Sequence, residues 1–140
     1  MNKSVNKKLD INKKQNSNKL NSSLNISSKK LREANRISII KLDGSINVGT
    51  YSIFHNTMIS LLKRGTKKFI LDCENLNNVN SLAINSIIDI MKNLNDKNSF
   101  RVVKPNKKLT KLINVLKLQN VLLTSEDIGN AIKSIRMSDR

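Results

Sequence analysis

The segment KKFILDCENLNNVNSLAINSIIDIMKNL, residues 67–94, decides the fold of this chain. Residues 69–71 are all apolar, which is typical of a strand covered on both faces in a parallel sheet. The four asparagines between positions 75 and 80 favour a turn, because asparagine side chains bond to nearby backbone. Apolar residues over 82–94 mostly follow helical spacing. The segment therefore predicts a buried strand, a polar bend and an amphipathic helix capped by Asn80 or Ser81.

Ser81 is expected at the start of that helix. The first helical turn presents unpaired backbone N–H groups and the positive end of the helix dipole. A phosphate there would add roughly −1.5 to −2 charges and would change the surface without breaking the helix. The position suits a phosphorylation site, and a serine that only caps the helix explains it equally well.

A hairpin is predicted before this segment. Residues 24–26 and 37–42 have strand character, and residues 33–35 read as the bend between them. Asp43 and Gly44 are expected to end the second strand.

The next predicted element is a helix over about residues 50–64, with Gly65 as its stop. Its core-facing stripe is expected to contain Ile53, Phe54, Met58, Ile59, Leu61 and Leu62. His55 falls off this stripe, which indicates an exposed surface residue.

The C-terminal part repeats the order of strand and helix. Residues 100–103 and 121–123 are predicted as strands, and residues 107–117 as a helix with a basic outer face. That helix is expected to bury Leu109, Leu112, Ile113 and Leu116. Residues 124–127 are expected to cap a final helix. Strands that alternate with helices predict an α/β fold with a mixed, largely parallel sheet and four helices.

Length and composition limit the organisation of the chain. With 140 residues, it has room for one domain and a tail. Residues 1–22 carry six lysines and one acid with few apolar residues, which predicts a flexible basic tail before a domain over 23–140. No stretch is as apolar as a membrane span or signal peptide, so we expect a cytoplasmic protein.

The formal charge of +16 raises nucleic acid or an anionic membrane as a partner. Twenty lysines and 22 asparagines are spread along the whole chain, however, and aromatic residues make up only 3%. Binding of single strands or RNA by stacking needs several aromatics on one face. Nucleic acid is therefore not expected as the main partner.

Catalysis and metal binding have little support. Cys73 is the only cysteine and His55 the only histidine, so neither a zinc site nor an internal disulfide is expected. Ser81 has no nearby histidine, and the four glycines form no phosphate-binding loop. We expect a protein that is not an enzyme and that needs no cofactor.

Two local motifs give the chain a resemblance to a known family. Residues 42–50, LDGSINVGT, resemble the L-x-G-E-L-D-x-x-T segment of the STAS domain, with Gly44 and Thr50 matching and Asn47 in place of the usual aspartate. Residues 79–84, VNSLAI, resemble that family's hydrophobic-D-S-[ST]-G-L segment, and residues 116–121 resemble its later L-x-x-x-G-L pattern less closely. The element order also agrees. The chain is thus similar to STAS domains of the bacterial anti-sigma factor antagonists.

The resemblance implies a regulatory protein of transcription that works by partner switching. In that family an anti-sigma factor that is also a serine kinase binds the antagonist and releases it after phosphorylating it. The residue in the corresponding position here is Ser81. The partner surface implied by the resemblance comprises Asn47, Thr50, Asn80, Ser81, Leu82 and Ala83.

The departures from the motif and the many lysines leave two alternatives. Asn80, Leu82 and Ala83 stand where the family has aspartate, a second hydroxyl residue and glycine. One alternative is a constitutive, unphosphorylated subunit of a larger assembly, such as a membrane-transport complex. The other is binding to nucleic acid or an anionic membrane through the tail with Lys67, Lys68, Lys104, Lys107, Lys108 and Lys111.

Overall fold

The computed structural model describes residues 23–31 and 36–137. The predicted tail and the predicted hairpin bend at 33–35 lie outside this part of the chain. The elements are, in order, β1 (Leu24–Lys30), β2 (Ile37–Ile46), α2 (Tyr51–Lys63), β3 (Lys68–Val79), α3 (Ser81–Leu94), β4 (Phe100–Val103), α4 (Lys107–Val115), β5 (Leu123–Ser125) and α5 (Ile128–Met137).

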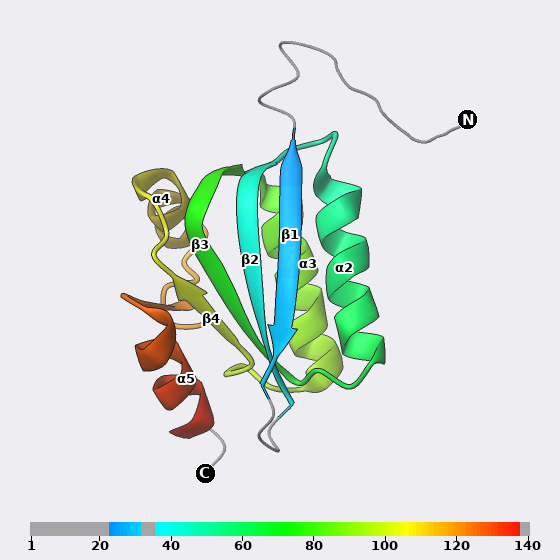
Figure 1. The fold of residues 1–140 in the computed structure, drawn as a ribbon. Helices are drawn as coiled ribbons and strands as arrows, with labels where there is room; N and C mark the ends of the chain where they lie inside the picture. Colours follow the sequence, from blue (N-terminus) through cyan, green and yellow to red (C-terminus); the bar gives the residue numbers. More distant parts are fainter. Residues whose placement is uncertain (1–22, 32–35, 138–140) are drawn as a thin grey trace, which may run out of the picture.

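The five strands form one sheet in the order β1-β2-β3-β4-β5, as Figure 1 shows. β1 pairs with β2 in antiparallel fashion, and the other three neighbouring pairs are parallel. Parallel neighbours need a crossover, which the intervening helices supply. The predicted mixed, largely parallel sheet with four helices is confirmed.

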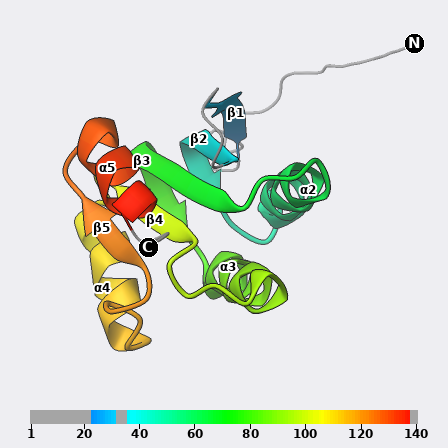
Figure 2. The ribbon, with the colours of Figure 1, turned by 90° about the horizontal axis from the view of Figure 1, so that it is seen from below.

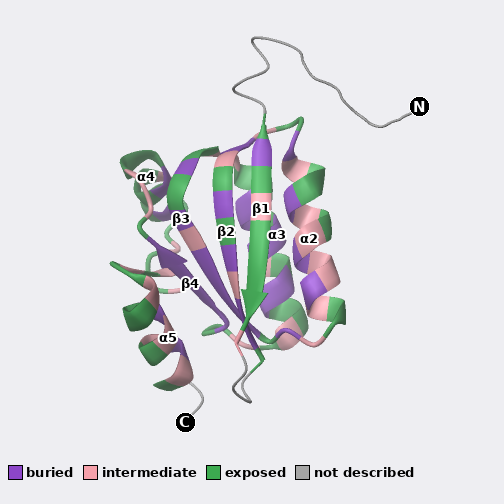
Figure 3. Ribbon diagram, viewed as in Figure 1, coloured by how far each residue is buried: buried purple, intermediate pink, exposed green. Residues whose placement is uncertain are grey.

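Two apolar clusters lie on opposite faces of the sheet. The larger one joins the sheet to α2, α3 and α4, with Phe54, Ile87 and Ile113 among its members. The smaller one joins β3 and β4 to α5 through Ile70, Val103 and Ile135. In Figure 2, α2 and α3 lie together on one side of the sheet. Figure 3 shows that much of β1 is exposed on the face turned to the viewer, because α5 packs mainly on β3, β4 and β5.

The predicted polar bend after residue 71 is wrong. β3 continues as a strand to Val79, because Cys73 and Leu76 still point into the larger core. Asn75, Asn77 and Asn78 lie in the strand, and only Asn80 falls at a helix start. Two register shifts with β2 accommodate this irregular stretch.

β2 is also longer than predicted. It passes through Gly44 to Ile46, and Gly44 has a φ of 121° that a residue with a side chain rarely adopts. One of the two register shifts follows Gly44 directly. A bulge at this glycine, in place of a strand end, lets β2 reach the edge where α2 begins.

Four side chains or boundaries lie elsewhere than predicted. Ile53 is 47% exposed, because it lies beside the buried stripe of α2, which consists of Phe54, Met58 and Leu61. α4 ends at Val115, and Leu116 is exposed after it. β5 covers residues 123–125 and not 121–123 as predicted. Leu122, just before the strand, is buried in the core. His55 is half-buried: its Nδ1 lies 2.8 Å from the Ser86 hydroxyl, and its ring stacks on Tyr51.

A Gly44→Ala substitution is expected to lower the free energy of unfolding by about 2–5 kcal/mol. The new methyl group would overlap the backbone carbonyl of Ser23, and the positive φ would be strained as well. Gly129→Ala, where a side chain meets only ordinary contacts, is the control and should leave stability unchanged or raise it by up to about 1 kcal/mol. Urea unfolding followed by circular dichroism measures both. Equal stability of the two variants would show that Gly44 is not required for the bulge.

Candidate functional site

Ser81 is the first residue of α3 and is exposed. Within the described residues its hydroxyl makes no hydrogen bond. The cap is instead Asn80, whose backbone is extended and whose Oδ1 accepts a hydrogen bond from Ala83 N at 3.1 Å. Of the two cap residues that the sequence left open, the structure thus selects Asn80. The Ser81 hydroxyl therefore has no structural role in the cap and points to solvent at a helix N-terminus.

A second corner, between β2 and α2, is held by reciprocal hydrogen bonds. Asn47 Oδ1 accepts from the backbone N–H of Gly49 at 2.9 Å and of Thr50 at 3.1 Å. The Thr50 hydroxyl accepts from Asn47 N at 3.0 Å and donates to the Ser45 carbonyl at 2.7 Å. These bonds fix the loop that carries Val48, which is 86% exposed.

The two corners lie next to each other at one edge of the sheet. β2 and β3 run parallel, and their last residues, Ile46 and Val79, are paired. Asn47 follows Ile46 directly, and Asn80 follows Val79 directly. The pairing of the strand ends therefore places the loop after β2 beside the start of α3, at the top of the molecule in Figure 1.

Three large apolar side chains are exposed at this edge. Val48 precedes α2, Ile53 lies in its first turn and is 47% exposed, and Leu82 follows Ser81 and is 45% exposed. We call the exposed residues Val48, Ile53, Ser81 and Leu82, together with the half-buried Asn47, the rim. An apolar surface around a free hydroxyl suits the binding of a protein partner.

The start of α4 borders the same edge. Asn106 Nδ2 donates to the carbonyls of Leu76 at 3.1 Å and Asn77 at 2.9 Å, and Lys108 Nζ donates to Asn78 Oδ1 at 3.1 Å. These contacts tie α4 to the end of β3. Sequence reasoning missed them, because it placed the asparagines of β3 in a bend, and no local signal pairs residues about 30 positions apart.

Two of the six residues predicted to contact a partner are buried. Thr50 is 5% exposed and Ala83 is 0% exposed. The Thr50 hydroxyl forms its hydrogen bonds within the β2–α2 corner, and the Ala83 methyl group packs into the larger core. Both support the rim from beneath, and the prediction that they contact a partner directly is corrected. Asn80 is half-buried, and Asn47, Ser81 and Leu82 remain at the rim.

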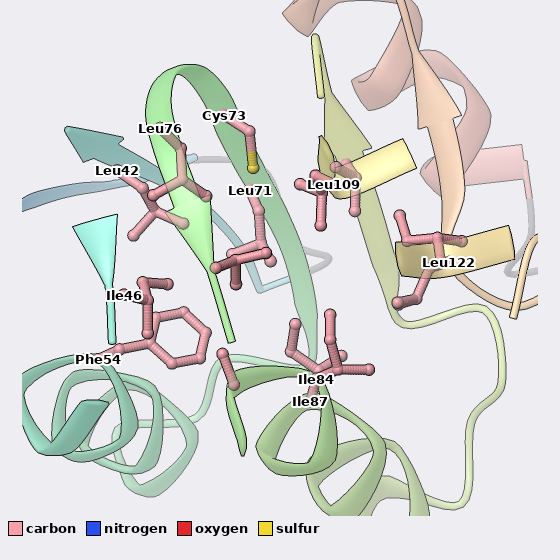
Figure 4. A pocket seen from close by; sticks show the side chains of 14 residues that line it. Leu42, Ile46, Phe54, Leu71, Cys73, Leu76, Ile84, Ile87, Leu109 and Leu122 are labelled. Carbon is pink, nitrogen blue, oxygen red and sulfur yellow. The ribbon is translucent and has the colours of Figure 1, made fainter. Parts of the chain in front are cut away.

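Cys73 lies in the core and away from any group that could activate it. Figure 4 shows its sulfur among the apolar side chains around a small internal cavity. Burial raises the pKa of the thiol to about 12, and the nearby Asp72 carboxylate adds to the effect. Among the described residues, no three His, Cys, Asp or Glu side chains gather to hold a metal ion. None of the described helices is long and apolar enough to span a bilayer.

Comparison with known proteins identifies the family. The family model described as "STAS domain" matches residues 28–131, which is most of the chain. The chain belongs to the STAS domain family. The match covers the β2–α2 corner, Ser81 and the start of α4. A search of curated protein sequences finds no match to this STAS domain.

Solved structures of low sequence identity share the fold. An anti-sigma factor antagonist from Mycobacterium paratuberculosis is 13% identical with a TM-score of 0.69, covering 81% of this chain and 95% of its own. The anti-sigma factor antagonist SpoIIAA in its unphosphorylated form is 14% identical with a TM-score of 0.64, covering 79% and 97%. The Bacillus cell fate determinant SpoIIAA in the phosphorylated form is 14% identical with a TM-score of 0.59, covering 79% and 100%.

Replacing Asn80 should separate the cap of α3 from the Ser81 hydroxyl. Asn80→Ala removes the acceptor for Ala83 N and is expected to lower the free energy of unfolding of the STAS domain by about 1 kcal/mol. Asn80→Asp keeps an acceptor and should preserve stability, and Ser81→Ala should change it little. Thermal unfolding of the three variants tests this. A larger loss in Ser81→Ala than in Asn80→Ala would overturn the assignment of the cap.

The Cys73 thiol is expected to resist alkylation in the folded protein. Raising its pKa from 9.0 to about 12 lowers the thiolate fraction at pH 8 roughly a thousandfold, and burial also blocks access. Iodoacetamide labelling followed by mass spectrometry, in buffer and in urea, measures the difference. Labelling in buffer at the rate seen in urea would show that Cys73 is not enclosed as described.

Proposed function

We propose that this STAS domain is a cytoplasmic, non-enzymatic regulator of the anti-sigma factor antagonist type. It binds an anti-sigma factor that is also a serine kinase through the rim, and phosphorylation of Ser81 releases it. The single observation that carries the proposal is the free Ser81 hydroxyl at the start of α3, beside exposed apolar side chains.

The position of Ser81 suits a charge switch. A phosphate at the N-terminus of α3 would be tolerated by the helix dipole, so modification would leave the fold intact. The same charge would lie next to Leu82, and it would oppose the docking of an apolar partner surface because a phosphate is strongly hydrated. The fold is thus stable in both states, while the surface differs between them.

The structural neighbours support this reading of Ser81. SpoIIAA, which shares the fold, is known in an unphosphorylated and a phosphorylated form. At the corresponding motif, Asn80 replaces the family's usual aspartate, yet it caps α3 with an equivalent side-chain acceptor. Ala83, which stands where the family has glycine, does not change the surface of the rim, because its methyl group points into the core.

A second candidate function is a constitutive subunit of a larger assembly. Leu82 favours it, since an apolar side chain that is 45% exposed beside Ser81 suits a permanent interface. In this case the rim is always covered, and Ser81 is never modified.

The basic surfaces are less suited to carry the main function. The six lysines that the sequence suggested as one patch are divided in space. Lys104, Lys107 and Lys108 lie at the edge where β4 ends and α4 begins, whereas Lys67 lies just before the opposite end of β3. Lys68 is buried and paired with Asp96 at 3.0 Å.

Ser81→Asp is expected to weaken binding of the partner by roughly 5-fold to 150-fold, while Ser81→Ala retains it. The control is Asn93→Asp, which adds the same charge near the other end of α3 and should leave binding unchanged. Affinity capture from the native cytoplasm with each variant identifies the partner, and titration of the purified partner gives the affinities. Equal binding by Ser81→Asp and Asn93→Asp would favour the constitutive subunit.

Phosphorylation itself is tested with the captured kinase. Incubation with ATP followed by mass spectrometry should locate one phosphate on Ser81 and none in the Ser81→Ala variant. Stable binding of the kinase without modification of Ser81 would contradict the proposed phosphorylation switch and would leave the rim as a docking surface only.

A further inference from the structure

A groove lies at the other end of α3, away from the rim. Its volume is about 550 Å³, and it is lined by residues from α3, the turn after it and the segment that leads to β5: Ile88, Met91, Lys92, Asn95, Asp96, Lys97, Leu118 and Val121. Sites for small molecules typically measure about 300–1,000 Å³ and combine apolar walls with a few polar groups. The size and the lining of this groove meet that description.

The groove follows a seam between α3 and the segment of residues 116–122, which follows α4. α3 packs against α2, but it makes few contacts with α4. Further along the same seam, Ile84 and Ile87 of α3 face Leu109 and Leu122 around the internal cavity of about 20 Å³ shown in Figure 4. The groove and the internal cavity thus lie at neighbouring positions of the same two segments, Ile88 beside Ile87 and Val121 beside Leu122.

The mouth of the groove is positively charged. Lys92 and Lys97 are exposed, and neither forms an ion pair with another described residue. Asp96 is the only acid of the lining. Its Oδ2 forms an ion pair with Nζ of the buried Lys68 at 3.0 Å. Burial would raise the pKa of Asp96, but the hydrogen bond from the Asn98 N–H and the contact with Lys68 hold this pKa below its usual value. Two lysines thus remain for a ligand.

The end of α3 does not oppose an anion strongly. Its carbonyls carry the negative end of the helix dipole. Asn95 adopts a left-handed conformation, so that its N–H donates to the Lys92 carbonyl at 3.1 Å, and Asp96 N donates to the Met91 carbonyl at 3.1 Å. These acceptors are already paired, and the lysines determine the sign of the field at the mouth.

We propose that this groove binds a free fatty carboxylate, with the acyl chain along the seam between α3 and residues 116–122 and the carboxylate between Lys92 and Lys97. The apolar walls would contact the acyl chain, and the two lysines, which form no ion pair with another described residue, would attract the carboxylate. A cationic or uncharged amphiphile would lack the attraction to the two lysines. The site uses none of the rim residues, so the proposal does not depend on the function of Ser81.

The full-length chain is titrated with octanoate, decanoate and dodecanoate by isothermal titration calorimetry, below their micelle concentrations. Each added methylene should tighten binding roughly fourfold until the seam is filled. Dodecyltrimethylammonium, with the same tail and the opposite charge, should bind at least about tenfold more weakly than dodecanoate. Backbone amide NMR shifts should concentrate on residues 88–97 and 118–121.

Variants assign the charge and the seam separately. Lys92→Glu combined with Lys97→Glu should weaken dodecanoate binding at least about tenfold, whereas Lys111→Glu combined with Lys133→Glu, the same change of net charge at exposed positions elsewhere, should not. Leu118→Asp should abolish binding, and circular dichroism checks that this variant folds. If it does not fold, the comparison of the two double charge variants tests the proposal.

Three results would overturn the proposal. The first is an equal loss of affinity in both double variants, which would indicate general attraction to a chain of +16 charge. The second is an affinity that does not depend on chain length. The third is binding to phosphatidylglycerol vesicles without binding to free dodecanoate, which would indicate a membrane surface.

Discussion

The parallel pairing of β2 with β3 up to the last residue of each strand is the constraint on which the rest depends. Main-chain hydrogen bonds run along this pair, and two register shifts keep both strands in step as far as Ile46 and Val79. Because each strand leads into a helix, the pairing fixes where α2 and α3 begin relative to each other. The bulge at Gly44 is part of the same constraint, since a β2 that ended there would leave the loop carrying Val48 without support.

The sequence predicts most of the fold, because its strongest signals are local. Residues 69–71 and the helical spacing over 82–94 correctly indicate a buried strand and a helix. The asparagines after residue 72 mislead, since their turn preference is overridden by the burial of Cys73 and Leu76 in the larger core. Turn propensity is a property of single residues, whereas burial depends on the partner strand.

The candidate site was predicted only in part. The position of Ser81 follows from the start of the helix, and Asn47 follows from the motif before α2. Ile53 could not be assigned to the rim, because helical spacing places it close to the core stripe, and only the packing of α2 shows that the buried stripe is limited to Phe54, Met58 and Leu61. The burial of Thr50 is equally hidden in the sequence, since its hydroxyl bonds to Ser45, on a strand that was expected to end earlier.

The two proposed sites lie at opposite ends of α3, and the helix keeps them apart. Ser81 and Lys92 are eleven residues apart in one helix, or roughly 16 Å along its axis. The Debye length at physiological ionic strength is about 8 Å, so a phosphate on Ser81 would change the field at the rim and very little at the groove. Any coupling between the two sites would therefore have to pass through packing, by way of Ile84 and Ile87, which line the cavity between them. A rigid helix with an incompletely filled seam along its side is a structure in which such packing changes can occur without loss of the sheet.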